Sequence, residues 1–425
     1  MCEYAEGLAA LYDSPRQSDY FDGILAEQEN LQAALEYAIG STPTLGARLA
    51  GTLWRHWERA GKYNHGLELV ERLRAVLPET EIFLHALLEE LTARLNAMQF
   101  RYAQAIPHYK RSKELYGEAD DSLLEAMMTC QEAAARRETY PHSDHNESFA
   151  LFKVGQAVVE AQGTLAQKAT YTLHEGYFHA RRGEEQSARD CLERGLTLFR
   201  IVGSQRGMFL GLHWLAYAAY LRNDKEVYLK LQREAMEVAQ ALGDASSHAI
   251  ALWNLSLGLN KHGDPRQAEQ LCHTGLTLTR QRGMGMTEVL FLTALGKVHV
   301  TQDNPAEARR WFRAGLKQAD ITNAIPHLML SMSWLTRLAL REAVANPTPD
   351  SLAVAAHLWG VLHRLEELLQ LDQQYDFDGP LDELVASVEA SMGKDAFAQE
   401  RDKAKRYERA EALLIPQLYP AEEAR

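Results

Sequence analysis

The chain has 425 residues, of which 46% are hydrophobic, 24% are charged and only 13 are prolines. This apolar content is too high for a disordered chain, and the abundance of alanine, leucine, glutamate and arginine favours helices. The formal net charge of −13 disfavours direct binding to nucleic acid, because an acidic surface repels phosphate backbones.

Residues 1–44 are expected to form an N-terminal helical cap. They begin without the cationic and apolar segments of a signal peptide, so we expect a cytoplasmic protein. No stretch of the chain approaches the roughly 18 uncharged apolar residues of a transmembrane helix, so no membrane partner is expected. The four cysteines lack the paired spacing of zinc sites and the density of a disulfide scaffold, which predicts reduced thiols.

Residues 45–345 repeat with a period of forty residues. One series of turn formers ends the predicted helix pairs, and its members are Gly163, Gly203, Gly243, Gly283 and Asn323. Glycine, and then asparagine, is preferred for the left-handed residue just past a helix. A second series is offset by twenty residues, predicts the tight turn inside each pair, and comprises Gly183, Asn223, Gly263 and Asp303.

Small residues also recur at fixed positions between these turns. Those of the first helix are Gly176, Ala216, Ser256 and Gly296, and those of the second helix include Gly195, Ala235, Gly275 and Gly315. Small residues let paired helices approach closely. The pattern resembles the tetratricopeptide repeat, whose usual period is about 34 residues, so a period of forty implies longer helices. We therefore predict an all-α fold, a tetratricopeptide-like right-handed superhelical solenoid of about eight helix pairs.

Residues 346–425 are expected to form a C-terminal helical cap, and both ends of the chain carry helix-packing motifs. The N-terminal motifs are Leu25, Glu29, Asn30, Leu31, Ala33, Ala34, Leu35 and Ala38, followed by Leu49, Ala50, Leu53, Trp54, Trp57 and Gly61. The C-terminal motifs are Ala355, Ala356, Leu358 and Gly360, followed by Gly393 and Phe397. Together they resemble the helical-repeat sensor region of bacterial STAND-class signal-transduction ATPases, which carry an NB-ARC-type ATPase ahead of such repeats.

The resemblance implies a regulatory region without its ATPase. A phosphate-binding loop needs serine or threonine after its Gly-Lys pair, but the three Gly-Lys pairs of this chain are followed by Tyr63, Val298 and Asp395. Neither terminus has the basic character of a DNA-recognition helix. The resemblance therefore implies a non-enzymatic sensor or scaffold that controls an attached or partner regulator of signalling or transcription. The alternative is a free-standing tetratricopeptide adaptor or peptide receptor, and an enzyme ranks third.

Two clusters of possible metal ligands do not predict catalysis. His174 and His179 flank Glu175 much as in a zinc-protease helix, but a spacing of five residues puts the imidazoles about 140° apart. His142, Asp144 and His145 lie in a polar segment that is typical of a surface loop. We expect no catalytic residue, no metal and no cofactor.

The predicted binding surface is the concave face, which the first helix of each pair lines in a tetratricopeptide array. Transferring that register gives Tyr177, Arg181, His213, Tyr217, Tyr220, Trp253, Asn260, Lys261, Lys297, Arg337 and Arg341, with Arg55 and Arg59 upstream. The alternative for any one of these residues is a core aromatic side chain or a solvated cation. As a set, aromatic and cationic side chains on an acidic chain indicate a groove for a protein or peptide, or for a small anionic ligand.

Overall fold

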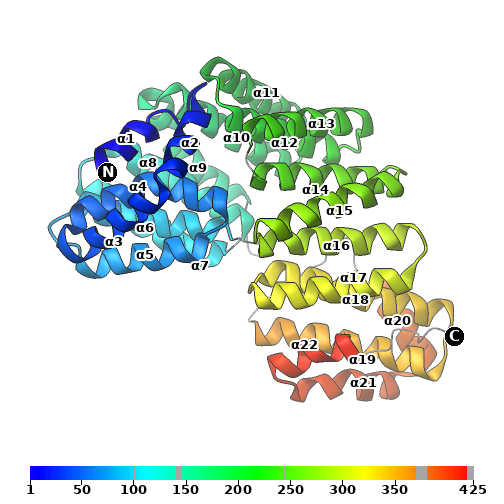
Figure 1. The fold of residues 1–425 in the computed structure, drawn as a ribbon. Coiled ribbons are helices and arrows are strands. Elements are labelled where there is room, and N and C mark those ends of the chain that lie inside the picture. The colour runs from blue at the N-terminus through cyan, green and yellow to red at the C-terminus, as the bar shows by residue number, and fades with distance from the viewer. Residues whose placement is uncertain (100, 140–144, 244, 370–380, 419–425) are drawn as a thin grey trace. The chain divides into compact units, whose positions relative to one another are not determined.

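The computed structural model describes residues 1–425 except 100, 140–144, 244, 370–380 and 419–425, and Figure 1 shows its fold. The elements of these residues are all helices, with no β-strand among them, which confirms the predicted all-α class. The chain divides into two compact units, residues 1–251 (unit 1) and residues 252–425 (unit 2), and the division falls inside helix α14 (Ala245–Lys261). None of the described helices is both long and apolar enough to cross a membrane.

Unit 1 starts with three helices and continues as a run of longer ones. The first three are α1 (Cys2–Ala9), α2 (Gln17–Ala26) and α3 (Gln28–Ser41). The run comprises α4 (Pro43–Ala60), α5 (Tyr63–Val76), α6 (Ile82–Ala97), α7 (Tyr102–Glu118), α8 (Ser122–Glu138), α9 (His145–Gln162), α10 (Leu165–Arg181), α11 (Glu185–Val202), α12 (Gln205–Leu221) and α13 (Lys225–Leu242).

Unit 2 continues the run and ends in shorter helices. Its elements after α14 are α15 (Pro265–Gln281), α16 (Gly285–Thr301), α17 (Pro305–Ile321), α18 (Ile325–Ala345), α19 (Pro349–Leu368), α20 (Asp382–Met392), α21 (Lys394–Asp402), the 3-10 helix η1 (Lys403–Arg406) and α22 (Arg409–Leu418). The C-terminal helices join one hydrophobic core with α18 and α19, in which Leu340, Val361 and Phe397 are buried. This core ties helices α20, α21 and α22 to α18 and α19.

The described helices from α4 to α19 form eight successive pairs, as the forty-residue period predicts. Both series of turn residues lie where they were expected. Asn223 has φ 58° between α12 and α13, and Gly203 has φ 76° after α11, so both adopt the left-handed conformation that ends a helix. Gly163 follows α9 as predicted, but a Cβ atom there would lie 2.6 Å from the carbonyl oxygen of Val159, so close backbone approach is what requires glycine at this position.

Glycines inside the helices mark close contacts between neighbouring helices. A Cβ atom on Gly195 of α11 would lie 2.5 Å from Leu173 of α10, a distance that real Cβ contacts do not show. The same atom on Gly296 of α16 would lie 2.4 Å from the Phe312 ring of α17. The recurrent small residues are therefore packing residues, because a larger side chain would occupy space that a buried leucine or phenylalanine already fills.

The N-terminal segment is held by arginines that the register had assigned to the concave face. The guanidinium carbon of Arg55 lies 3.4 Å from the ring centroid of Tyr12, and that of Arg59 lies 4.2 Å from the centroid of Phe21. Arg59 also donates a hydrogen bond of 3.0 Å to the carbonyl of Gly243, and Arg206 forms an ion pair with Glu58. Within unit 1, α4 thus contacts α12 and the end of α13.

Candidate binding site

Aromatic side chains from two neighbouring helices of unit 1 stack on one another. The ring of Tyr177 on α10 lies 5.1 Å from the indole of Trp214 on α12, with 21° between the planes, and 5.4 Å from the ring of Tyr217. The Arg181 guanidinium donates a hydrogen bond of 3.2 Å to the Tyr217 hydroxyl. On the other side, the guanidinium carbon of Arg137 from α8 lies 4.2 Å from the Tyr177 centroid. We call these five residues the aromatic cluster.

The aromatic cluster borders a cleft of about 390 Å³. Arg181 and Tyr217 belong to both features. The other lining residues come from the ends of α9, α10, α11 and α12 and are His145, Ala180, Gly183, Glu185, Ala188, Ala218, Leu221 and Arg222. With two arginines against one glutamate, the cleft favours a ligand group that carries negative charge.

Arg137 is the buried cation of the cluster. It is only 3% exposed, and its Nε donates a hydrogen bond of 2.9 Å to Glu138. One of its terminal nitrogens, NH1, is buried without a hydrogen-bond partner among the described residues. Burial raises the pKa of Tyr177 above its usual value, so the phenol beneath this guanidinium stays neutral at physiological pH. The interior of the cluster therefore joins a cation to a neutral aromatic ring, and Arg181 and Tyr217 are its members at the cleft.

The structure brings together three of the residues that the sequence assigned to the site in unit 1, namely Tyr177, Arg181 and Tyr217. Besides Arg55 and Arg59, which contact Tyr12 and Phe21, the other two pack elsewhere. The imidazole of His213 lies 6.3 Å from the Phe209 ring with 13° between the planes, and the Tyr220 ring lies 5.7 Å from that of Tyr228. These two side chains therefore contribute to packing beside the cluster.

Sequence reasoning missed Arg137 and Trp214, although the period contained a signal for Arg137. Arg137 lies forty residues before Tyr177, which itself lies forty residues before Tyr217. Trp214 lies forty residues after His174, whose ring it contacts at 4.9 Å. Extending the Tyr177 column by one period toward the N-terminus would have found Arg137, whereas Trp214 shares its column with His174, which was not assigned to the site.

In unit 2, two cations that were predicted as site residues lie near the same aromatic ring, that of Trp334, which was not among the predicted site residues. Lys297 Nζ of α16 lies 5.3 Å from the Trp334 centroid, and the guanidinium carbon of Arg337 on α18 lies 5.6 Å from it. Arg337 is only 6% exposed, so its guanidinium belongs to the packed interior rather than to an open surface.

The remaining predicted residues of unit 2 lie on α14 and near the end of α18. Trp253, Asn260 and Lys261 lie on α14, and Arg341 lies exposed one turn beyond Arg337 on α18. The side-chain oxygen of Asn260 is buried without a hydrogen-bond partner among the described residues. The aromatic cluster of unit 1 is therefore the better defined of the two sites.

The partly buried His213 predicts a loss of stability in mild acid. Burial lowers its pKa from 6.5 to about 4, so the folded protein keeps this imidazole neutral at pH 5, whereas the unfolded chain protonates it. The unfolded state therefore binds more protons between pH 6.5 and pH 4, and the free energy of unfolding falls as the pH is lowered through this window. Urea unfolding of wild type and of His213→Leu at pH 7 and pH 5 measures the effect. Between pH 7 and pH 5, the free energy of unfolding should fall less in the variant than in wild type, by about 1 kcal/mol per pH unit. An equal fall in the free energy of unfolding of both proteins would contradict the expectation.

Comparison with known proteins identifies the fold. No protein-family model and no curated protein sequence matches the chain. Among solved structures, a Rap protein in complex with Competence and Sporulation Factor is 12% identical and superposes with a TM-score of 0.52 over 85% of this chain and 95% of that one. The apo form of RapI is 12% identical, with a TM-score of 0.50 over 87% of this chain and 97% of that one.

A STAND protein with a tetratricopeptide repeat sensor from Pyrococcus horikoshii is also similar. It is 12% identical, with a TM-score of 0.47 over 85% of this chain and 52% of that one. The likeness to the two Rap structures shows a helical-repeat fold of the tetratricopeptide type.

Proposed function

We propose that this chain, a helical-repeat protein of the tetratricopeptide type, is a non-enzymatic scaffold that binds a peptide or an extended segment of a protein. The aromatic cluster of unit 1 and its adjoining cleft carry the proposal. Tyr177 stacks on Trp214 and contacts Tyr217, and Tyr217, Arg181 and Arg222 line the cleft beside them. Such a surface provides contact area at low entropic cost together with charge-assisted donors.

The preferred ligand is an acidic segment. Guanidinium groups bind carboxylates through paired N–H donors. Two arginines line the cleft, and Glu185 is the one acidic residue among its lining residues. A cleft of about 390 Å³ accommodates a few side chains rather than a folded domain. A related use of the fold supports this assignment, because the Rap protein of similar fold was solved in complex with Competence and Sporulation Factor.

The second part of the proposal is that the chain acts in a regulatory system of the STAND type. The helix-packing motifs near residues 25–61 and 355–397 resemble the sensor regions of STAND-class regulators. In that setting residues 45–345 would sense the ligand, the segments 1–44 and 346–425 would cap the repeats, and the regulated partner would be a cytoplasmic signalling or transcription ATPase. A neighbouring reading frame that encodes a phosphate-binding loop would support this setting over a free-standing adaptor.

Selection from a phage-displayed library of short peptides tests the proposal. The purified chain should enrich peptides that combine Asp or Glu with apolar residues, because the cleft joins arginines to aromatic rings. Affinity of a selected peptide should fall as salt is raised toward physiological concentration, since screening weakens partly exposed charge pairs. Enrichment of basic peptides, or of none, would contradict the proposal.

A further inference from the structure

A polar group with the composition of a metal site lies beside the aromatic cluster in unit 1. Glu175 and His179 are four residues apart on α10, so they share one face of that helix. Cys191 lies on α11, the partner helix of the same pair. One ligand atom from each of the three side chains lies within 4.8 Å of the other two.

We propose that Glu175, His179 and Cys191 bind a divalent metal ion of the zinc class. A thiolate, an imidazole and a carboxylate are the three ligand types that zinc takes in proteins. The sulfur and nitrogen donors disfavour calcium and magnesium, which prefer oxygen ligands. Three protein ligands leave the fourth tetrahedral position for water or for a group of a bound partner. This inference does not rest on the proposed function.

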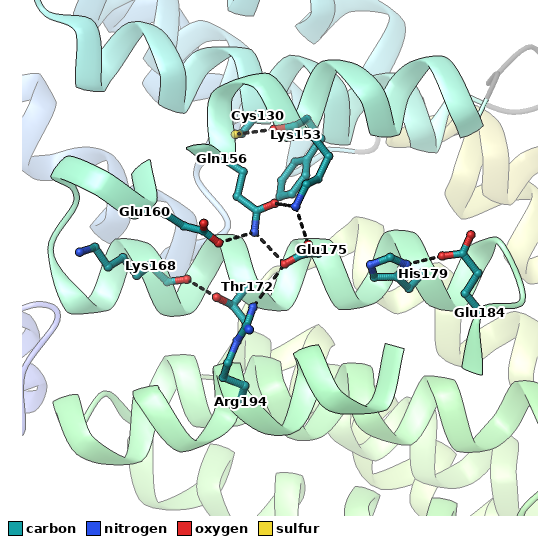
Figure 2. A network of polar contacts seen from close by, with 11 residues as sticks. Cys130, Lys153, Gln156, Glu160, Lys168, Thr172, Glu175, His179, Glu184 and Arg194 are labelled. Atoms are coloured by element: carbon teal, nitrogen blue, oxygen red, sulfur yellow. Dashed lines mark hydrogen bonds and ion pairs between the residues drawn. The ribbon is translucent and has the colours of Figure 1, made fainter. Parts of the chain in front are cut away.

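The surroundings of His179 resemble those of a metal-binding histidine. Its Nδ1 forms a hydrogen bond with the carboxylate of Glu184, and that carboxylate also pairs with Arg182 at 2.8 Å. Figure 2 shows His179 between Glu175 and Glu184. A carboxylate that holds one imidazole nitrogen orients the ring and leaves the other nitrogen as the ligand, which is the usual arrangement around a zinc-bound histidine.

In the structure the Glu175 carboxylate is already paired with cationic side chains. Lys153 Nζ lies 2.7 Å from one of its carboxylate oxygens, and Gln156 donates a hydrogen bond of 2.7 Å to the other, which Arg194 approaches at 3.4 Å (Figure 2). The Lys153 and Arg194 side chains are 47% and 58% exposed, whereas that of Glu175 is 10% exposed. Both cations can move into solvent when a metal ion arrives, so binding is an exchange of Lys153 for the metal.

The sequence suggested a different pair of ligands, which we rejected. It set His174 against His179 on one helix, and their angular separation excluded a shared ion. The structure instead turns the His174 ring toward Trp214, at 4.9 Å, and leaves Glu175 and His179 to face Cys191 of the next helix.

Titration of the purified, reduced chain with cobalt(II) tests the site. A thiolate ligand gives cobalt an intense charge-transfer absorption, which reports sulfur ligation specifically. Cys130 and Cys272 are buried, at 1% and 0% exposed, and are not comparable with Cys191. Cys2 is partly exposed, as Cys191 is, so Cys2 provides the matched control. We expect the absorption in wild type and in Cys2→Ser and its loss in Cys191→Ser. No absorption in wild type, or one that survives in Cys191→Ser, would overturn the proposal.

Two further variants separate metal binding from folding. His179→Gln should weaken cobalt binding at least tenfold, since it removes a ligand, with helicity measured by circular dichroism unchanged. Lys153→Gln should instead tighten binding by roughly three- to fivefold, the effect of a half-exposed ion pair that no longer competes. Weaker binding in Lys153→Gln would show that Lys153 does not compete with the metal and would contradict the exchange.

Discussion

Replacing Gly275 with leucine is expected to lower the free energy of unfolding of unit 2 by about 1–3 kcal/mol or more. Gly275 lies on α15, and a Cβ atom there would stand 2.1 Å from the ring of Phe291 on α16. Phe291 is 0% exposed, so its ring has no solvent-filled space into which it can move. Overpacking must therefore separate α15 from α16. Urea unfolding, followed by circular dichroism, measures the change.

Gly40→Leu is the matched control for that experiment. Gly40 lies exposed near the end of α3, and nothing stands within 4 Å of its Cβ position. The free energy of unfolding of the Gly40→Leu variant should differ from that of wild type by no more than about 0.5 kcal/mol. If the two leucine variants unfold at the same urea concentration, the assignment of Gly275 as a packing residue is wrong.

Truncating the aromatic cluster should reduce the affinity for a selected acidic peptide. Tyr217 contributes a ring face and a hydroxyl that pairs with Arg181, so Tyr217→Ala removes contact area and leaves the guanidinium unsupported. Arg181→Ala removes a donor that lines the cleft. Each substitution should cost about 2 kcal/mol or more, close to a 30-fold loss of affinity, as for an interface hot spot. Fluorescence anisotropy with a labelled peptide measures this loss.

Matched variants on other surfaces show whether the loss is local. Tyr37 on α3 is 72% exposed, and Arg233 is exposed on α13. Tyr37→Ala and Arg233→Ala remove the same chemical groups without touching the cluster, so affinity should stay within about twofold of wild type. Equal losses in the control pair and in the cluster pair would show that the peptide binds elsewhere.

The repeat architecture was predictable because its signals are local. A left-handed residue after a helix is preferentially glycine or asparagine wherever it occurs, so Gly203 and Asn223 marked their turns without knowledge of the fold. The packing glycines were equally visible, since Gly195 and Gly275 each face one neighbouring helix. Gly163 kept its predicted place for a different reason, the closeness of the Val159 carbonyl.

The site was only partly predictable because side-chain direction depends on tertiary packing. The repeat register identified Tyr177, Arg181 and Tyr217, which do meet. It could not show that Arg337 is buried beside Trp334, since helix periodicity does not say which neighbours cover a residue. Likewise, the approach of Cys191 to Glu175 depends on how α10 packs against α11, and no spacing along the chain encodes it.

Site-specific photocrosslinking decides whether the cleft of unit 1 is where the ligand binds. Leu221 ends α12, lines the cleft and is 49% exposed, whereas Ile201 on α11 is 68% exposed and does not line the cleft. A photoreactive phenylalanine derivative replaces each in turn, and the chain is irradiated with the selected acidic peptide. Binding in the cleft predicts a crosslinked product at position 221 that excess unlabelled peptide abolishes, and little product at position 201. Equal crosslinking at both positions, or crosslinking at 201 alone, would contradict a peptide site at the aromatic cluster.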